Sequence, residues 1–179
     1  MDSLLKLSRG IDWLNDRCAT FAWWASFLSC MISAANAIVR YGFDYTSNAY
    51  TEMQWYLFAA CVMLGAAQVL RVNEHVRVDV LYGNYSGKYQ AITDLAGFLL
   101  FLLPSMAIML YYAWPLFAKM YTTGEMSSQS GGLIRWPVML MLPLGFALII
   151  LQGLSEAIKR VAWLTHQYDG DFHYERPLQ

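Results

Sequence analysis

The densest group of side chains that could do chemistry follows an apolar run in the first half of the chain. Five ionisable residues fall within nine positions there: Arg71, Glu74, His75, Arg77 and Asp79. A histidine beside two carboxylates could form one corner of a metal site, but sites for transition metals usually combine several strong ligands. We therefore expect no metal and no cofactor here. We interpret the segment as an anchor whose two arginines bind lipid phosphates or partner carboxylates.

Other catalytic patterns are missing from the sequence. It contains no nucleophile motif, no cluster of metal ligands and no phosphate-binding glycine loop. Cys18, Cys30 and Cys61 lie in apolar stretches without a CxxC pair, as small buried hydrophobic residues do. All three histidines lie outside the apolar runs, which argues against a haem-binding helix bundle. We expect that the chain is not an enzyme.

The composition is that of a membrane protein. Hydrophobic side chains make up 58% of the 179 residues and charged ones 14%, against about 25% charged in soluble domains. The net charge of −1 gives no reason to expect a nucleic-acid partner. Helices cross a bilayer with roughly 20 apolar residues and satisfy their own backbone groups. We expect an all-α integral membrane protein with four transmembrane helices, one for each charge-free window: 18–39, 53–70, 95–118 and 136–155.

The segment 1–17, before the first window, is also patterned. Apolar residues recur at three- and four-residue steps with charged residues between them: Leu4, Leu7, Ile11 and Leu14. This spacing predicts a short amphipathic helix on the cytoplasmic surface of the membrane. The segment and the apolar run after it also resemble a signal peptide. Three aspartates in the leading segment favour a true span instead.

The linker 71–94 can be read in two ways. Alternating valines and polar residues are typical of a strand, whereas charges at four-residue spacing are typical of a helix. A lone strand beside the membrane would leave backbone groups unpaired, so we expect a helix that extends from the second span into the interface. We expect a transmembrane domain over 18–162 and a polar tail over 163–179.

The distribution of basic residues predicts the orientation. Nine of the twelve Lys and Arg residues lie before the first window, between the second and third, or after the fourth. The other two loops hold the remaining three. By the positive-inside rule, both termini are expected in the cytoplasm.

The two outer loops carry their own candidates. Arg40 and Glu52 bracket the first loop at similar depth, so they either form an ion pair or are solvated separately. The second outer segment, 119–135, is the longest and is rich in serine and glycine, and we expect it to be mobile. Both loops lie where an external partner could bind.

Two features within the windows concern packing. Gly65 lies in a run of small residues over 64–67, where another helix can approach closely. Pro104 predicts a kink in the third span, because proline removes one backbone hydrogen bond and clashes with the preceding turn. None of the windows contains Asp, Glu, Lys, Arg or His, although such residues usually mark ion pathways. We interpret the chain as a membrane partner protein without an ion pathway of its own.

Several motifs resemble one known family, the small membrane subunit (Q subunit, DctQ type) of tripartite ATP-independent periplasmic (TRAP) transporters. The resemblance covers about residues 8 to 162 and is most specific where the small-residue run is followed by HVRVD. The segments that carry it are Arg40-Tyr41, Glu52, Leu64-Gly65-Ala66-Ala67, Asn73-Glu74-His75-Val76-Arg77-Val78-Asp79, Gly131-Gly132-Leu133-Ile134-Arg135-Trp136-Pro137, Leu142-Pro143-Leu144-Gly145-Phe146 and Gln152-Gly153-Leu154-Ser155-Glu156. Many relatives show two adjacent acids before the second span, where this chain has Glu52 alone.

The resemblance implies one part of a sodium-driven importer of an organic acid in the bacterial inner membrane. Its partners would be a large permease subunit (DctM type), which holds the substrate and sodium sites, and a periplasmic solute-binding protein. The small subunit would brace the large one, and its outer loops could help to dock the binding protein near Glu125 and Ser128. The alternative is a membrane assembly or regulatory protein unrelated to transport.

Overall fold

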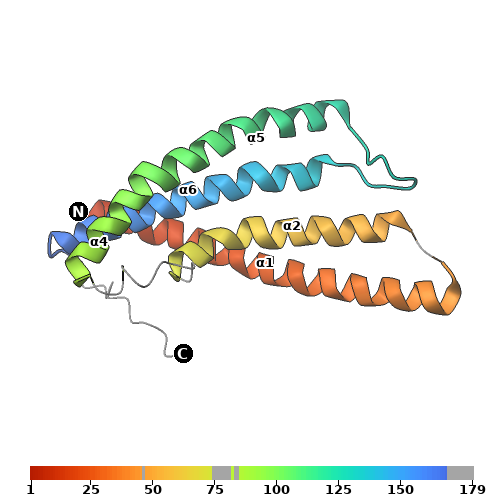
Figure 1. Cartoon of the computed structure of the whole chain (residues 1–179), viewed down its shortest axis with the longest axis horizontal. Helices are drawn as coiled ribbons and strands as arrows, with labels where there is room; N and C mark the ends of the chain where they lie inside the picture. The colour runs from red at the N-terminus through yellow and green to blue at the C-terminus, as the bar shows by residue number, and fades with distance from the viewer. Residues whose placement is uncertain (46, 74–81, 83–84, 169–179) are drawn as a thin grey trace.

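The chain forms a long bundle of helices that run side by side (Figure 1). A computed structural model describes residues 1–45, 47–73, 82 and 85–168. The helices are α1 (Asp2–Phe43), α2 (Asn48–Arg71), α4 (Gly87–Gly97), the π-helical turn η1 (Phe98–Leu102), α5 (Leu103–Thr123) and α6 (Trp136–Leu164). The loops after α1 and after α5 lie at one end of the bundle, and the N-terminus lies at the other.

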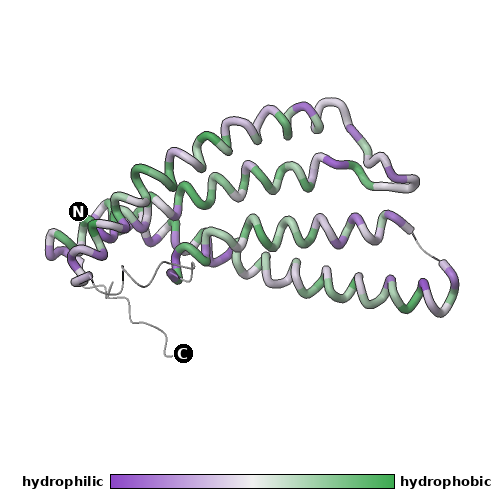
Figure 2. Tube along the Cα trace, viewed as in Figure 1, coloured by the Kyte–Doolittle hydropathy of each residue, from purple (hydrophilic) through white to green (hydrophobic). Residues whose placement is uncertain are grey.

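Four helices of the described part of the chain are long and apolar enough to cross a membrane, as the four charge-free windows predict. They are α1, α2, the continuous helix Gly87–Thr123 and α6. Figure 2 shows that hydrophilic residues gather at the ends of the bundle, whereas hydrophobic ones dominate the middle of the helices. This distribution is what a bilayer around the middle of the bundle requires.

Helix α6 is the centre of the packing, because it contacts α1, α2, α4 and α5. Small residues let the helices come close. A Cβ atom placed on Gly65 would lie 3.7 Å from Ala22 Cβ, and one on Gly145 would lie 2.6 Å from Met63 Cε. The core that α1, α2 and α6 share consists of Ala22, Ala25, Ala60, Leu64, Ala67 and Leu148. Close packing of this kind stabilises helices in lipid, where apolar surface gains little by leaving the bilayer.

The segment 1–17 does not form a separate helix but the first turns of α1. Its apolar residues Leu4 and Leu7 are exposed, whereas its polar residues Ser8 and Asn15 are buried. Ser8 and Asn15 therefore pack against α6, with hydrogen bonds to Ser155 and Gln152. Whether its apolar face lies on the membrane surface stays a prediction.

An irregular turn lies where the sequence predicts a kink. In η1 the N–H of Leu103 donates to the carbonyl of Phe98, five residues earlier. The next residue, Pro104, has no N–H to donate to the carbonyl of Leu100. A π-helical turn accommodates such a break without ending the helix. Figure 1 shows the helix curving from α4 into α5.

Candidate functional site

Polar side chains of α1 and α6, together with Asp94 of α4, bind one another at the end of the bundle where the chain starts. We call this set the α1–α6 cluster. Its side chains recur at three- and four-residue steps along each helix and so lie on one face of it. Its members are Ser8, Asp12, Asn15, Asp94, Gln152, Ser155, Glu156, Lys159 and Arg160.

Asp12 is the acceptor at the centre of this cluster. Its Oδ1 accepts hydrogen bonds from Gln152 Nε2 at 3.0 Å and from Ser155 Oγ at 2.9 Å. Its Oδ2 lies 3.1 Å from Lys159 Nζ. The carboxylate thus gains three donors from one helix. Several hydrogen bonds to one carboxylate that is largely shielded from water hold the two packed helices in one register.

A second part of the cluster connects α4 to α6. Arg160 Nη1 donates to Glu156 Oε2 at 2.7 Å, and its Nη2 donates to Asp94 Oδ2 at 2.9 Å. The guanidinium also lies 4.6 Å from the centre of the Phe98 ring. Arg160 is 3% exposed, so the planar fork of its donors holds two carboxylates away from water.

Arg71 connects α2 to the same end of the bundle. Its Nη1 donates to the backbone oxygen of Asp12 at 3.3 Å and forms an ion pair with Asp16. The hydrogen bond from Arg71 lowers the pKa of the Asp16 carboxyl, which lies before the apolar window 18–39. The sequence predicts Arg71 as a contact for lipid or for a partner, and the structure shows that part of its hydrogen bonding is used within the chain.

The opposite end of the bundle carries a closed hairpin between α5 and α6. An isolated bridge pairs Met126 with Ile134, and Ser127 N donates to Leu133 O at 2.9 Å. Gly131 turns the chain with a φ of 72°, which side chains other than glycine rarely adopt. The sequence predicts a mobile loop here. The structure shows a hairpin that is hydrogen-bonded to a charged residue on α2, and its mobility stays a prediction.

One face of α2 supplies the contacts that hold this hairpin. Glu52 Oε2 accepts the N–H of Leu133 at 2.6 Å, and its Oε1 accepts the hydroxyl of Ser127. One turn on either side, Asn48 Nδ2 donates to Ser130 O at 2.9 Å and Tyr56 Oη donates to Ile134 O at 3.1 Å. Because Asn48, Glu52 and Tyr56 are four residues apart, they lie in one row along the helix. We call these three residues and the hairpin the hairpin cluster.

From the sequence, Arg40 and Glu52 either form an ion pair or are solvated separately, and the structure shows neither arrangement for Glu52. Glu52 is buried, and its carboxylate turns to Ser127 and Leu133, whereas Arg40 is exposed. Hydrogen bonds from Ser127 and then from the Leu133 N–H lower the pKa of the Glu52 carboxyl, which precedes the apolar window 53–70. The carboxylate is therefore ionised at neutral pH.

The other residues that the sequence predicts as interface or docking sites lie partly in the described residues and partly outside them. Gly65 faces Ala22 within the bundle. Glu125 forms an ion pair with Arg135 at 2.8 Å, and Ser128 is exposed. The charged segment after α2 is not described, and this includes Glu74, His75, Arg77 and Asp79.

Most of the α1–α6 cluster was not predicted from the sequence, although polar residues at helical spacing indicate it. Gln152 is a polar residue inside an otherwise apolar window, and Glu156 follows it by one helical turn. Polar residues at Ser8, Asp12 and Asn15 repeat at the same spacing on the first segment. A polar stripe on each of two helices indicates that they can pair.

Neither cluster has the features of a reaction centre. Among the described residues, no group of three or more His, Cys, Asp or Glu side chains could hold a metal ion. The charged side chains of the two clusters bind one another or backbone groups, so they join segments of the chain. The fold and these clusters define a multi-pass helical membrane protein whose polar side chains lock its own helices together.

Comparison with known families agrees with this class. The family described as "Tripartite ATP-independent periplasmic transporters, DctQ component" matches residues 29–162. The chain belongs to this family, whose members are the small subunits of TRAP transporters. Neither the curated proteins nor the solved structures gave a match.

Proposed function

We propose that this small TRAP subunit is a scaffold that braces the large permease subunit of a sodium-coupled, binding-protein-dependent importer of an organic acid. The α1–α6 cluster is the observation that supports a scaffold. It joins α1, α4 and α6 through side chains that are buried or partly buried, and Arg71 adds α2. A bundle locked in this way can act as one rigid body beside a moving subunit.

We also propose a topology for the subunit. Both termini and the α1–α6 cluster lie on the cytoplasmic side of the bacterial inner membrane, and the hairpin cluster lies on the periplasmic side. The distribution of the twelve Lys and Arg residues supports this orientation. Reporter fusions to the C-terminus and after Ser128 test it. Periplasmic activity of the C-terminal fusion would contradict the proposal.

The hairpin cluster is our candidate for contact with the periplasmic binding protein. A hairpin that is ordered before binding loses little conformational entropy when a partner docks. It offers exposed side chains such as Ser128, beside a pocket of about 320 Å³ lined by Trp55, Tyr56 and Arg135. Crosslinking from position 125 or 128 tests this contact. Absence of adducts during transport would argue against docking here.

Eight residues are our candidates for contact with the large subunit. These are Arg40, Glu52, Gly65, Arg71, Glu74, His75, Arg77 and Asp79, with phospholipids as the other possible partner of the arginines. Glu52, Gly65 and Arg71 already make contacts within the chain, so substituting them would affect assembly through the fold of this subunit.

Co-purification and uptake together test the proposed function. The chain is expressed with its large permease subunit, and uptake into proteoliposomes is measured with the cognate binding protein and a sodium gradient. We expect the two subunits to co-purify and uptake to require both of them. Uptake that persists at full rate without this chain would favour an assembly or regulatory role. Uptake by this chain alone would contradict a scaffold.

A further inference from the structure

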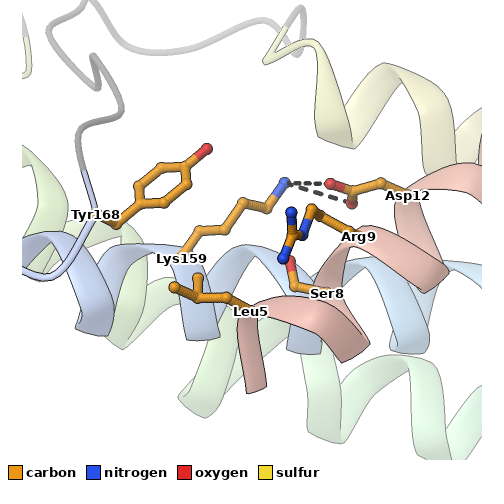
Figure 3. A pocket seen from close by; sticks show the side chains of 6 residues that line it. All are labelled: Leu5, Ser8, Arg9, Asp12, Lys159 and Tyr168. Atoms are coloured by element: carbon orange, nitrogen blue, oxygen red, sulfur yellow. Dashed lines mark hydrogen bonds and ion pairs between the residues drawn. The ribbon is translucent and has the colours of Figure 1, made fainter. Parts of the chain in front are cut away.

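A pocket of about 270 Å³ opens beside the α1–α6 cluster (Figure 3). The first turns of α1 and the last turns of α6 form its walls. The charge-free windows of these two helices begin at Cys18 and end at Ser155, so the pocket lies just beyond the apolar layer, at the depth of lipid headgroups. The residues that line it are Leu5, Ser8, Arg9, Asp12, Lys159 and Tyr168.

The pocket wall contains two cations, Lys159 and Arg9, and only Lys159 is paired with carboxylates of the described residues. Lys159 Nζ lies between the carboxylates of Asp12 and Glu156 and is committed to the cluster. Arg9 forms no ion pair or hydrogen bond through its side chain with any residue that the structure describes. Figure 3 shows its guanidinium pointing toward the Lys159–Asp12 pair. A planar guanidinium with free donors is suited to a phosphate group, which accepts two of its N–H groups side by side.

The wall also limits which phosphate compound can bind. Lys159 is paired with the carboxylates of Asp12 and Glu156, so among the described residues Arg9 supplies the one unmatched positive charge of the wall. This balance suits the single negative charge of a phosphodiester and disfavours a polyphosphate. Leu5 adds an apolar surface, and the neighbouring side chains of Leu4 and Leu7 are exposed. An apolar surface next to a phosphate site favours a ligand with a hydrocarbon part.

We propose that this pocket binds the phosphodiester of a phospholipid headgroup, with Arg9 as the residue that contacts the phosphate. The lipid would come from the leaflet on the side of the first turns of α1. The inference depends on the membrane fold and not on the transporter partners, so it stands or falls separately from the proposed function. Binding there would connect the first turns of α1 to the lipid surface.

The test uses the full-length chain purified in detergent, with bound lipid removed. Phosphatidylglycerol, a diacylglycerol with the same acyl chains, and inorganic phosphate are added in separate samples. Retention is measured by native mass spectrometry and stability by the melting temperature. We expect phosphatidylglycerol to be retained and to raise the melting temperature, whereas the other two compounds do neither.

Two variants locate the site. Arg9→Gln should lower retention of phosphatidylglycerol about tenfold, the size expected for a lost charge-assisted hydrogen bond. Lys6→Gln removes an exposed cation of the same segment and should retain the lipid like the unaltered chain. Equal retention by Arg9→Gln would overturn the proposal. Diacylglycerol binding as well as phosphatidylglycerol, or an equal shift from inorganic phosphate, would also overturn it without relying on any variant.

Discussion

Asp12 and Lys159 are 147 residues apart in sequence, yet Lys159 Nζ lies 3.1 Å from Asp12 Oδ2. The pair joins the start of α1 to the end of α6, and both side chains are largely shielded from water. The same carboxylate accepts hydrogen bonds from Gln152 and Ser155. The first turns of α1 and the last turns of α6 are thus held by one shared acceptor.

Replacing Asp12 should lower the free energy of unfolding more than replacing an exposed charged residue does. Asp12→Ala leaves Lys159 and two neutral donors without their partner, and we expect a loss of about 3 kcal/mol in the free energy of unfolding. Chemical denaturation in detergent measures it. Asp2→Ala removes an exposed carboxylate from the same helix and should change stability little.

A double-mutant cycle separates the ion pair from the other bonds of Asp12. Lys159→Met removes the charge but keeps most of the length of the side chain. Because the two residues form an ion pair, Asp12→Ala together with Lys159→Met should lower the free energy of unfolding by clearly less than the sum of the two single losses. Additive losses would show that the two residues do not interact.

The hairpin cluster should depend on the Glu52 carboxylate. Glu52→Ala removes the acceptor of the Leu133 N–H and of the Ser127 hydroxyl, so the hairpin should open and its cleavage by added protease should rise several-fold. Glu52→Gln keeps one acceptor oxygen and should give an intermediate rate. Asp44→Asn changes an exposed acid of the other outer loop and serves as the control. Equal cleavage in all variants would show that Glu52 does not hold the hairpin.

The pH dependence of the same cleavage follows from the lowered pKa of Glu52. A carboxyl whose pKa is lower when folded adds stability above its unfolded pKa, about 4.3 for glutamate. That contribution falls as the pH drops below this value and through the folded pKa. We expect the hairpin to stay closed near neutral pH and to open only in acid. A variant without the carboxylate should lose this acid-dependent step, which a pH series with an acid-stable protease would measure.

The four membrane spans could be predicted from the sequence because lipid excludes unpaired charges, and long charge-free windows therefore mark them. The ends of the helices could not be predicted in this way. Asp2 begins α1 and Leu164 ends α6, although charged residues lie between these positions and the windows. A charge marks where the apolar layer ends, and a helix continues beyond it wherever its polar side chains find partners.

The partners of Glu52 show why pairings are harder to predict. Neighbouring positions across one loop suggested Arg40, but Leu133, 81 residues further along the chain, supplies the bond. The row Asn48, Glu52 and Tyr56 is visible in the sequence as a four-residue repeat. What it binds depends on the hairpin lying over α2, and no local pattern in the sequence encodes that arrangement.

Helices α2 and α6 lie so close together at Gly145 that a residue with a side chain should not fit there. An added Cβ would lie 2.6 Å from Met63 Cε and 2.9 Å from the backbone oxygen of Met63, so Gly145→Ala must push the helices apart. We expect a loss of roughly 1–3 kcal/mol, typical of overpacking, seen as a lower melting temperature. Gly10→Ala is the matched control, since no atom lies within 4 Å of its added Cβ. It should raise stability by about 0.5–1 kcal/mol through helix propensity.

The attachment of α4 to α6 should require an arginine at position 160. Lysine keeps the charge but not the planar fork that reaches Asp94 and Glu156 together. We expect Arg160→Lys to lose about 2 kcal/mol, the value of one or two charge-assisted hydrogen bonds. Amide hydrogen exchange should then speed up mainly in α4 and η1, with α2 protected as before. Uniform faster exchange across all helices would show instead that Arg160 supports the whole bundle, and unchanged exchange would show that the charge alone is sufficient.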